Sequence, residues 1–169
     1  MDGAKTLRIW YSSMSGGTQQ RAGAACAGAV AEAKGSGMKV RLLRAAEAGP
    51  DDVLDASGYL FATPENLAAI SGQLKDFFDR TYYAALEQVN GRPYAVLICA
   101  GSDGSNAAKQ VARIATGWRL KAVAEPFIVC THAQTTEAIL APKRTGAEDL
   151  DHCRALGEAL AEGLAMGVL

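Results

Sequence analysis

The sequence predicts an α/β fold in which helices cover both faces of one parallel sheet, in a three-layer, doubly wound arrangement. Short apolar runs alternate with helical patterns along the whole chain, without repeats, low-complexity tracts or long linkers. This alternation is typical of a parallel sheet, because right-handed crossovers place the connecting helices on its faces. The chain of 169 residues has the length of one ordinary domain, so we expect residues 1–169 to form a single domain.

Three strands are expected in the first half of the chain. The first is Leu7–Tyr11, and a loop of small residues joins it to an Ala-rich helix at about Thr18–Lys34, which the following glycines end. The second strand is Lys39–Leu43, and the polar connection after it has room for only a turn or two of helix. The third strand is Gly58–Ala62.

The second half adds two strands and three helices. Apolar residues at i, i+4, i+7 and i+8 from Ile70 predict one face of a helix that ends near Tyr83. The fourth strand, Tyr94–Cys99, is apolar throughout, as expected of a central strand covered on both faces. A helix at about Ser105–Thr116 and a fifth strand within Ala122–Cys130 follow. The last helix, from about Glu148, has an apolar stripe that consists of Leu150, Cys153, Leu156, Leu160 and Leu164.

Composition and charge exclude several classes of protein. With 49% apolar and 21% charged residues and a mean hydropathy of +0.03, the chain is neither disordered nor fibrous. Its 17 basic and 18 acidic residues give a formal net charge of −1, without the basic excess of a nucleic-acid binder. No apolar stretch approaches the roughly 18–20 residues of a membrane span. The first residues contain no signal peptide, which predicts a cytoplasmic protein.

Cysteine and histidine positions predict no metal site. The four cysteines lie far apart without a Cys-x-x-Cys pair, and we expect them to be buried, reduced thiols. A zinc site needs clustered ligands. His152 and Cys153 do not form one, because adjacent helical residues point about 100° apart. Cys99, inside an apolar strand, is expected to be a poor nucleophile.

The loop after the first strand is a candidate phosphate site. In a doubly wound sheet the ligand binds at the carboxyl ends of the strands, where the winding direction reverses. A phosphate in this loop would meet free backbone N–H groups, the positive end of a helix dipole and up to three hydroxyls, without a Lys or Arg. The glycine patterns of triphosphate and dinucleotide loops are absent, and a flexible turn with an N-capping serine remains the alternative. The loop consists of Ser13, Met14, Ser15, Gly16, Gly17 and Thr18.

The loop after the fourth strand also combines glycines with small polar residues. A surface turn whose Ser105 caps the next helix would explain it equally well. However, the Gly/Ser-containing loops after strands 1, 3 and 4 all fall at one edge of the predicted sheet, which favours a binding site. The loop after the fourth strand consists of Ala100, Gly101, Ser102, Asp103 and Gly104.

Two segments resemble those of a known family. The first loop is similar to the flavodoxin phosphate loop Ser/Thr-x-Thr-Gly-x-Thr, which Ser13, Ser15, Gly16 and Thr18 match. The segment after the third strand resembles Gly-Thr-Pro…Ser-Gly-x-x-Lys-x-Phe-x-Asp-Arg of flavodoxin-like NAD(P)H-dependent FMN reductases and quinone reductases. Its matching residues are Thr63, Pro64, Ser71, Gly72, Leu74, Lys75, Phe78, Asp79 and Arg80.

The resemblance implies a flavodoxin-like sheet with strand order 2-1-3-4-5 and a bound FMN. NAD(P)H would give a hydride to the flavin, which would pass electrons to a quinone, a free flavin or a similar acceptor, so no catalytic side chain is required. The pair Tyr82-Tyr83 would belong to a contact in a homo-oligomer, a dimer or tetramer. The implied FMN-binding residues are the six of the first loop, then Thr63, Pro64, Glu65, Asn66 and Leu67, and the five of the fourth-strand loop.

One departure from the family pattern supports a flavin-free binding module, and an electron-transfer flavodoxin is a separate alternative. Family members often place an aromatic residue against the flavin ring, whereas residues 65–69 offer only Leu67 as an apolar wall and would bring the charge of Glu65 near the ring if it points inward. The alternatives are a non-catalytic electron-transfer flavodoxin and a flavin-free binding module. Trp118 is expected in the core, and His132 either contacts a ligand or ends a loop.

Overall fold

The computed structural model describes residues 3–169 and contains one mostly parallel sheet in the order β2-β1-β3-β5-β6. Its main strands are β1 (Thr6–Tyr11), β2 (Lys39–Arg44), β3 (Gly58–Asn66) and β5 (Pro93–Ala100). Two short strands, β6 (Lys121–Ala122) and β7 (Phe127–Cys130), take the place of the fifth predicted strand. They pair in parallel with the start and the end of β5, respectively. The predicted flavodoxin-like fold and strand order are therefore confirmed.

The division of the last strand into β6 and β7 has a local cause. Residues 123–126 between the two pieces include Pro126, which has no N–H group to donate to a neighbouring strand. The chain therefore leaves the ladder after β6 and rejoins β5 at Phe127, opposite Leu97.

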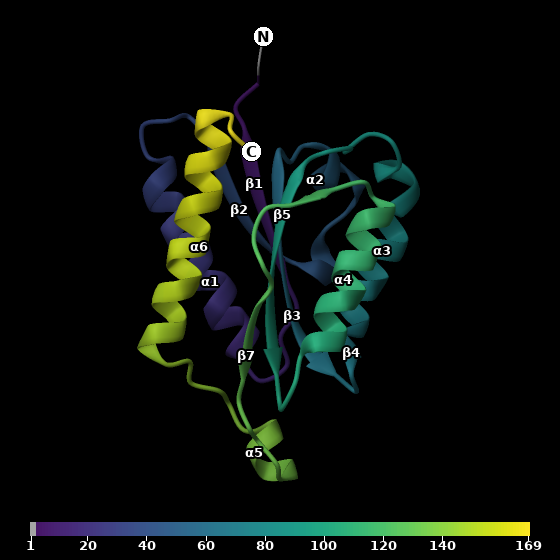
Figure 1. The fold of residues 1–169 in the computed structure, drawn as a ribbon, viewed down its shortest axis with the longest axis vertical. Coiled ribbons are helices and arrows are strands. Elements are labelled where there is room, and N and C mark those ends of the chain that lie inside the picture. Colours follow the sequence, from purple (N-terminus) through teal and green to yellow (C-terminus); the bar gives the residue numbers. More distant parts are fainter. Residues whose placement is uncertain (1–2) are drawn as a thin grey trace.

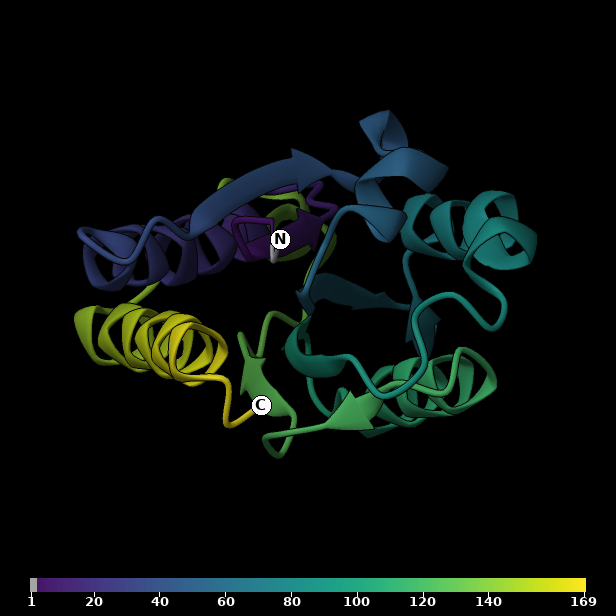
Figure 2. The same cartoon turned by 90° about the horizontal axis from the view of Figure 1, so that it is seen from above.

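Helices form a layer on each face of the sheet (Figure 1). One layer contains α1 (Gly17–Ala33) and α6 (Ala147–Met166), and the other contains α3 (Gly72–Ala85) and α4 (Ser105–Gly117). Figure 2 shows these two layers with the sheet between them. The short elements are η1 (Ala45–Glu47), α2 (Pro50–Leu54) and α5 (Thr136–Leu140), of which α5 lies beyond the carboxyl ends of the strands. No helix within residues 3–169 is long and apolar enough to cross a membrane.

The two faces of the sheet are packed by different kinds of side chain. On the α3/α4 face, Trp10 lies against Phe77 with ring centroids 4.8 Å apart, and Phe78 meets the edge of Trp118 at 5.4 Å. Trp118 is 2% exposed, so its predicted place in the core is confirmed. On the other face, alanines of α1 pack with leucines and Cys153 of α6. Small side chains allow α1 and α6 to approach closely.

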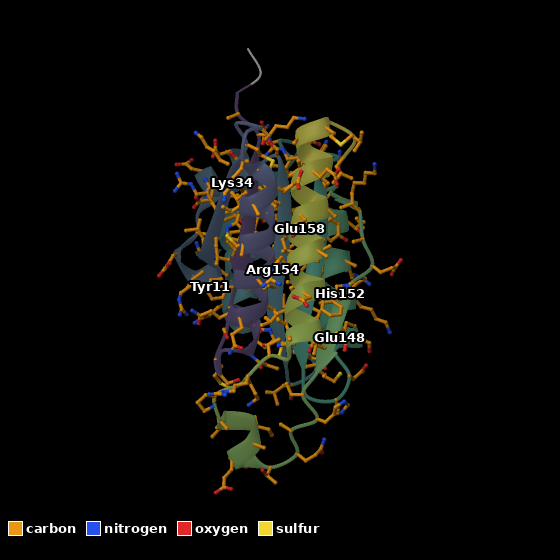
Figure 3. All side chains as sticks on the ribbon, turned by 90° about the vertical axis from the view of Figure 1, so that its left-hand side faces the viewer. Tyr11, Lys34, Glu148, His152, Arg154 and Glu158 are labelled. Carbon is orange, nitrogen blue, oxygen red and sulfur yellow. The ribbon has the colours of Figure 1, made fainter. Side chains whose placement is uncertain are left out.

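Two glycines set the distance between α1 and α6, which lie side by side in Figure 3. A Cβ added to Gly157 would lie 1.9 Å from the carbonyl oxygen of Ala25, and one added to Gly28 would lie 2.1 Å from that of Arg154. Both contacts are with backbone, which a side-chain rotation cannot relieve. Each helix therefore requires glycine where the other crosses it.

The third strand and the helix after it differ from the sequence-based expectation. The prediction ended the strand at Ala62, but β3 continues to Asn66 and turns back as β4 (Ala69–Ile70), which pairs with it antiparallel. Ile70 is therefore in β4. The prediction that it belongs to the apolar face of the following helix is wrong. Ser71 caps α3 by accepting a hydrogen bond from the backbone N–H of Leu74, at 3.2 Å.

We expect Gly157→Ala to lower the free energy of unfolding by about 1–3 kcal/mol, because the new methyl group overpacks the α1/α6 contact. Gly23→Ala, in α1, is the matched control, since no described atom lies within 4 Å of the added Cβ. This substitution should stabilise the helix by up to about 1 kcal/mol. Urea denaturation of both variants measures the difference, and equal effects would contradict the close contact.

Candidate functional site

A cavity of about 90 Å³ opens at the carboxyl ends of the parallel strands. The cavity is bounded by the ends of four strands, because parallel strands all end at the same edge of the sheet. Its lining residues are Ser13, Met14, Ser15, Gly17, Thr18, Pro64, Glu65, Asn66, Cys99, Ala100, Gly101, Thr131, Ala133, Ile139 and Lys143.

One end of the cavity is the start of α1. Gly16 has φ +93°, a left-handed conformation that favours glycine, and its N–H donates to Ser13 Oγ at 3.1 Å. The first N–H groups of the helix, at Gly17 and Thr18, have no acceptor within the helix. The first turn of α1 contains no acidic residue. The hydroxyls of Ser15 and Thr18 make no hydrogen bond to residues 3–169, so this end of the cavity is rich in free donors.

Gly17 allows neighbouring segments to approach the start of α1. A Cβ at this position would lie 3.2 Å from Cys99 Sγ and 3.4 Å from the Cβ of Lys143. A larger residue would therefore fill the concave surface that the loop forms at the helix N-terminus. The free donors at the helix N-terminus suit a phosphate group.

A β-hairpin forms the opposite wall. It turns at Leu67 and Ala68, which have φ +50° and +60°, a left-handed conformation that costs a non-glycine residue about 1–2 kcal/mol. Contacts with α4 compensate for this cost: Asn106 donates to the carbonyl of Ala68, and Gln110 Oε1 accepts from the N–H of Ile70 at 2.8 Å. The hairpin is thus fixed to the side of α4.

Glu65 joins the hairpin to the start of α4. Its two carboxylate oxygens accept hydrogen bonds from the N–H groups of Gly104 and Ala107, at 3.0 and 3.1 Å. The negative charge is therefore paired with the positive end of the α4 dipole. The prediction that Ser105 caps α4 is wrong, because Ser105 is the first residue of the helix. Glu65 accepts from the N–H groups at the helix start in its place.

A segment far along the chain closes the remaining side. We call residues 131–146, which include α5, the strap. The N–H of Lys143 donates to the carbonyl of Ser15 at 2.8 Å. The side chain of Gln20 holds the strap from α1: its Nε2 donates to the carbonyl of Lys143 at 2.5 Å, and its Oε1 accepts from the N–H of Thr145 at 2.9 Å.

Most of the predicted site residues are brought together, and some are not. Ten of them line the cavity: Ser13, Met14, Ser15, Gly17, Thr18, Pro64, Glu65, Asn66, Ala100 and Gly101. The other six do not line it. Gly16 precedes α1, Thr63 is buried and accepts a hydrogen bond from the N–H of Ser71, and Leu67 is fully exposed at the hairpin tip. Ser102 is exposed, Asp103 accepts a hydrogen bond from Ser105, and the N–H of Gly104 donates to Glu65.

The sequence-based reasoning missed five lining residues. Thr131 and Ala133 follow the last strand, so their position at the sheet edge could have been inferred. Cys99 was expected in an apolar strand but faces the cavity from the end of β5. Ile139 and Lys143 carry no local signal, because only the fold of the strap brings them to the start of α1. His132 is exposed and does not line the cavity.

Motif residues beyond the hairpin have structural contacts instead. Lys75 pairs with Asp79 at 2.6 Å on the surface of α3. Arg80 donates to the carbonyls of Ala45 and Ala48, at 3.1 and 2.9 Å, and so fixes the connection that contains η1. Lys75 and Arg80 of the motif therefore have structural contacts that do not involve the cavity.

The four free thiols have different environments, and the expectation that all are buried is wrong. Cys26, Cys99 and Cys130 are partly exposed, and only Cys153 is buried. Burial raises the pKa of the Cys153 thiol to about 11. Cys99 Sγ lies 3.2 Å from Nη1 of Arg21, a buried side chain of α1.

The fold and the cavity define a flavodoxin-like α/β protein. The family model of NADPH-dependent FMN reductases matches residues 13–135, and the chain therefore belongs to that family. Membership makes it a flavin-binding oxidoreductase or flavodoxin-like protein and supports FMN as its cofactor. No curated protein sequence matches the chain.

Solved structures share the fold at low sequence identity. A flavodoxin from the domain Archaea is 17% identical, with a TM-score of 0.74 over 94% of this chain and 98% of that one. A WrbA-like flavodoxin from Agrobacterium tumefaciens is 16% identical, with a TM-score of 0.65 over 98% and 99%. A flavodiiron core from Synechocystis is 15% identical, with a TM-score of 0.75 over 98% of this chain but 37% of that one. Identities this low establish the fold alone.

Replacing Glu65 by Ala should lower the free energy of unfolding by about 1–2 kcal/mol, because two N–H groups at the start of α4 lose their acceptor. Glu158→Ala, on the exposed face of α6, is the control and should change stability by less than about 0.5 kcal/mol. Urea denaturation compares the two variants. If they unfold alike, the Glu65 cap contributes nothing to the fold.

Proposed function

We propose that this chain binds FMN in the cavity and acts as an oxidoreductase, taking reducing equivalents from NAD(P)H and passing them to a quinone, a free flavin or a similar acceptor. The observation that carries the proposal is the start of α1, where free N–H groups and hydroxyls without an acidic side chain face the cavity at the carboxyl ends of the strands. The membership of the NADPH-dependent FMN reductase family supports both the cofactor and the donor.

The two ends of the cavity suit the two ends of FMN. Ser15, Gly17 and Thr18 would hold the phosphate through N–H groups and hydroxyls, with Ser13, Met14 and Gly16 shaping the loop. The wall of Pro64, Glu65 and Asn66 and the loop from Ala100 to Gly104 would enclose the flavin ring, with Thr63 and Leu67 shaping the hairpin. Bound FMN would supply the electron-transfer chemistry that side chains lack.

Glu65 is compatible with a reduced flavin at this wall. A free carboxylate beside the ring would disfavour an added negative charge by Coulomb repulsion. Here both oxygens of Glu65 accept from N–H groups of α4, whose dipole offsets the charge. The hairpin therefore brings an acidic residue to the wall with much of its field compensated.

A second hollow provides space for the electron donor or acceptor. It has a volume of about 360 Å³ and shares Ser13, Met14, Pro64 and Asn66 with the cavity. Its other residues belong to the end of β1 and the start of α3. We propose that the nicotinamide or the acceptor binds in this second hollow, next to a flavin in the cavity.

A non-catalytic electron-transfer flavodoxin is the second candidate. Nearly the whole of a flavodoxin from Archaea superimposes on the chain. Among the described lining residues there is also no aromatic side chain to stack on the ring, which is the feature that favours a flavin-free binding module.

The visible spectrum of the purified protein, an FMN titration and an NAD(P)H oxidation assay separate these functions. We expect one FMN per chain and oxidation of NADPH or NADH that depends on an added quinone or flavin. FMN binding without turnover would indicate an electron carrier, and a colourless protein that ignores FMN would indicate a flavin-free module.

Ser15→Asp should weaken FMN binding at least tenfold, about 1.4 kcal/mol or more, because a carboxylate at the start of α1 repels the phosphate and occupies the free N–H groups. Ser36→Asp, in the turn after the opposite end of the same helix, is the control and should leave the dissociation constant unchanged. Fluorescence quenching of FMN measures both. An unchanged constant for Ser15→Asp would place the phosphate elsewhere.

FMN should protect Cys99 from alkylation, since Cys99 lines the cavity. Cys130 is partly exposed but does not line it, and should react at the same rate with and without FMN. Cys153 should stay unmodified near pH 8, because burial and its raised pKa keep the thiolate rare. Mass spectrometry after iodoacetamide treatment measures each site, and equal protection of Cys99 and Cys130 would argue against FMN in this cavity.

A further inference from the structure

Charged side chains lie at opposite ends of the cavity. Among its described lining residues, Glu65 is the one acidic side chain and Lys143 the one basic side chain. Glu65 belongs to the hairpin wall, whereas the Cβ of Lys143 lies 3.4 Å from the position of a Cβ on Gly17. The positive residue is therefore beside the proposed phosphate end.

The strap holds the backbone of Lys143 at the start of α1. Its N–H donates to the carbonyl of Ser15 at 2.8 Å, and its carbonyl accepts from Gln20, which is 123 positions away in the sequence. The second bond of Gln20, to the N–H of Thr145, fixes the direction of the strap. Three hydrogen bonds thus place Lys143 at the N-terminus of α1. Arg21 Nη1 also lies 3.1 Å from the position of a Cβ on Gly17, but Arg21 is paired with Asp149 at 3.6 Å.

The ammonium of Lys143 is bound only by neutral groups. It donates to the carbonyls of Ala138, Ile139 and Ala141, at 2.6, 2.8 and 2.8 Å. No carboxylate within residues 3–169 pairs with it, in contrast to Lys75, whose charge is offset by Asp79. Every residue of α5 is exposed, so the helix that the ammonium caps has little other support. The ammonium therefore has no paired negative charge, and contact with an anion in the cavity requires it to exchange these carbonyls for the anion.

We infer that Lys143 is a phosphate-recognising residue and that the strap makes the cavity select FMN over riboflavin. This inference rests on the proposed function, because it assigns a residue to the same flavin site. A phosphomonoester carries a charge of about −1.5 to −2 near neutral pH. N–H groups and hydroxyls offer it only dipoles, whereas the lysine ammonium adds a full charge on a flexible stem. Riboflavin lacks the phosphate and gains nothing from this charge.

The dissociation constants of FMN and riboflavin for wild type, Lys143→Met and Lys143→Arg test the inference. Lys143→Met should weaken FMN about tenfold and riboflavin less than about twofold. Lys143→Arg keeps the charge and should preserve the preference for FMN. Lys121→Met, an exposed lysine of β6 at the opposite edge of the sheet, is the charge-matched control and should change neither constant.

Ionic strength and a strap variant provide independent readouts. Raising the salt concentration from about 0.01 to about 0.1 M shortens the Debye length from about 30 to about 10 Å, so FMN binding should weaken more in wild type than in Lys143→Met. Gln20→Ala, which removes two hydrogen bonds to the strap, should also lower the preference for FMN over riboflavin.

The outcomes distinguish the inference from the proposed function. Equal weakening of FMN and riboflavin by Lys143→Met would mean that the strap acts by packing, and an unchanged ratio would mean that Lys143 does not contact the phosphate. Either result, with normal FMN binding by wild type, overturns the inference alone. Failure of the wild type to bind FMN overturns the proposed function and the inference together.

Discussion

Two helix N-termini face the cavity, and the chain supplies a carboxylate to only one of them. Glu65 reaches across from the hairpin and accepts from two N–H groups at the start of α4. The start of α1 has no acidic residue in its first turn. Because each helix end has a partial positive charge, the uncapped one is the site that an anion can occupy. Under the proposed function, this difference would direct the FMN phosphate to α1 and the flavin ring to the hairpin.

The fold produces this arrangement through the parallel direction of β1, β3, β5 and β7. Their carboxyl ends meet at one edge of the sheet, so segments distant in sequence become walls of one cavity. The hairpin and the strap are additions to this common plan. Each is fixed by polar side chains of a neighbouring helix, the hairpin by Asn106 and Gln110 of α4 and the strap by Gln20 of α1.

The sequence predicts the sheet order and most helices, because apolar periodicity and glycine loops are local signals. It also predicts the start of α1 as a phosphate site. It does not predict the hairpin, since Leu67 and Ala68 are not the glycines or asparagines that usually adopt positive φ. Their conformation depends on contacts with α4 about forty residues later. The position of Lys143 depends in the same way on Gln20, at a separation of 123 positions.

Backbone amide NMR during an FMN titration, with riboflavin as the second ligand, tests the account most directly. If the start of α1 holds the phosphate, the amide proton resonances of Gly17 and Thr18 move downfield with FMN and stay in place with riboflavin. Binding of FMN that leaves these two resonances unchanged, or moves them equally with riboflavin, would contradict the account.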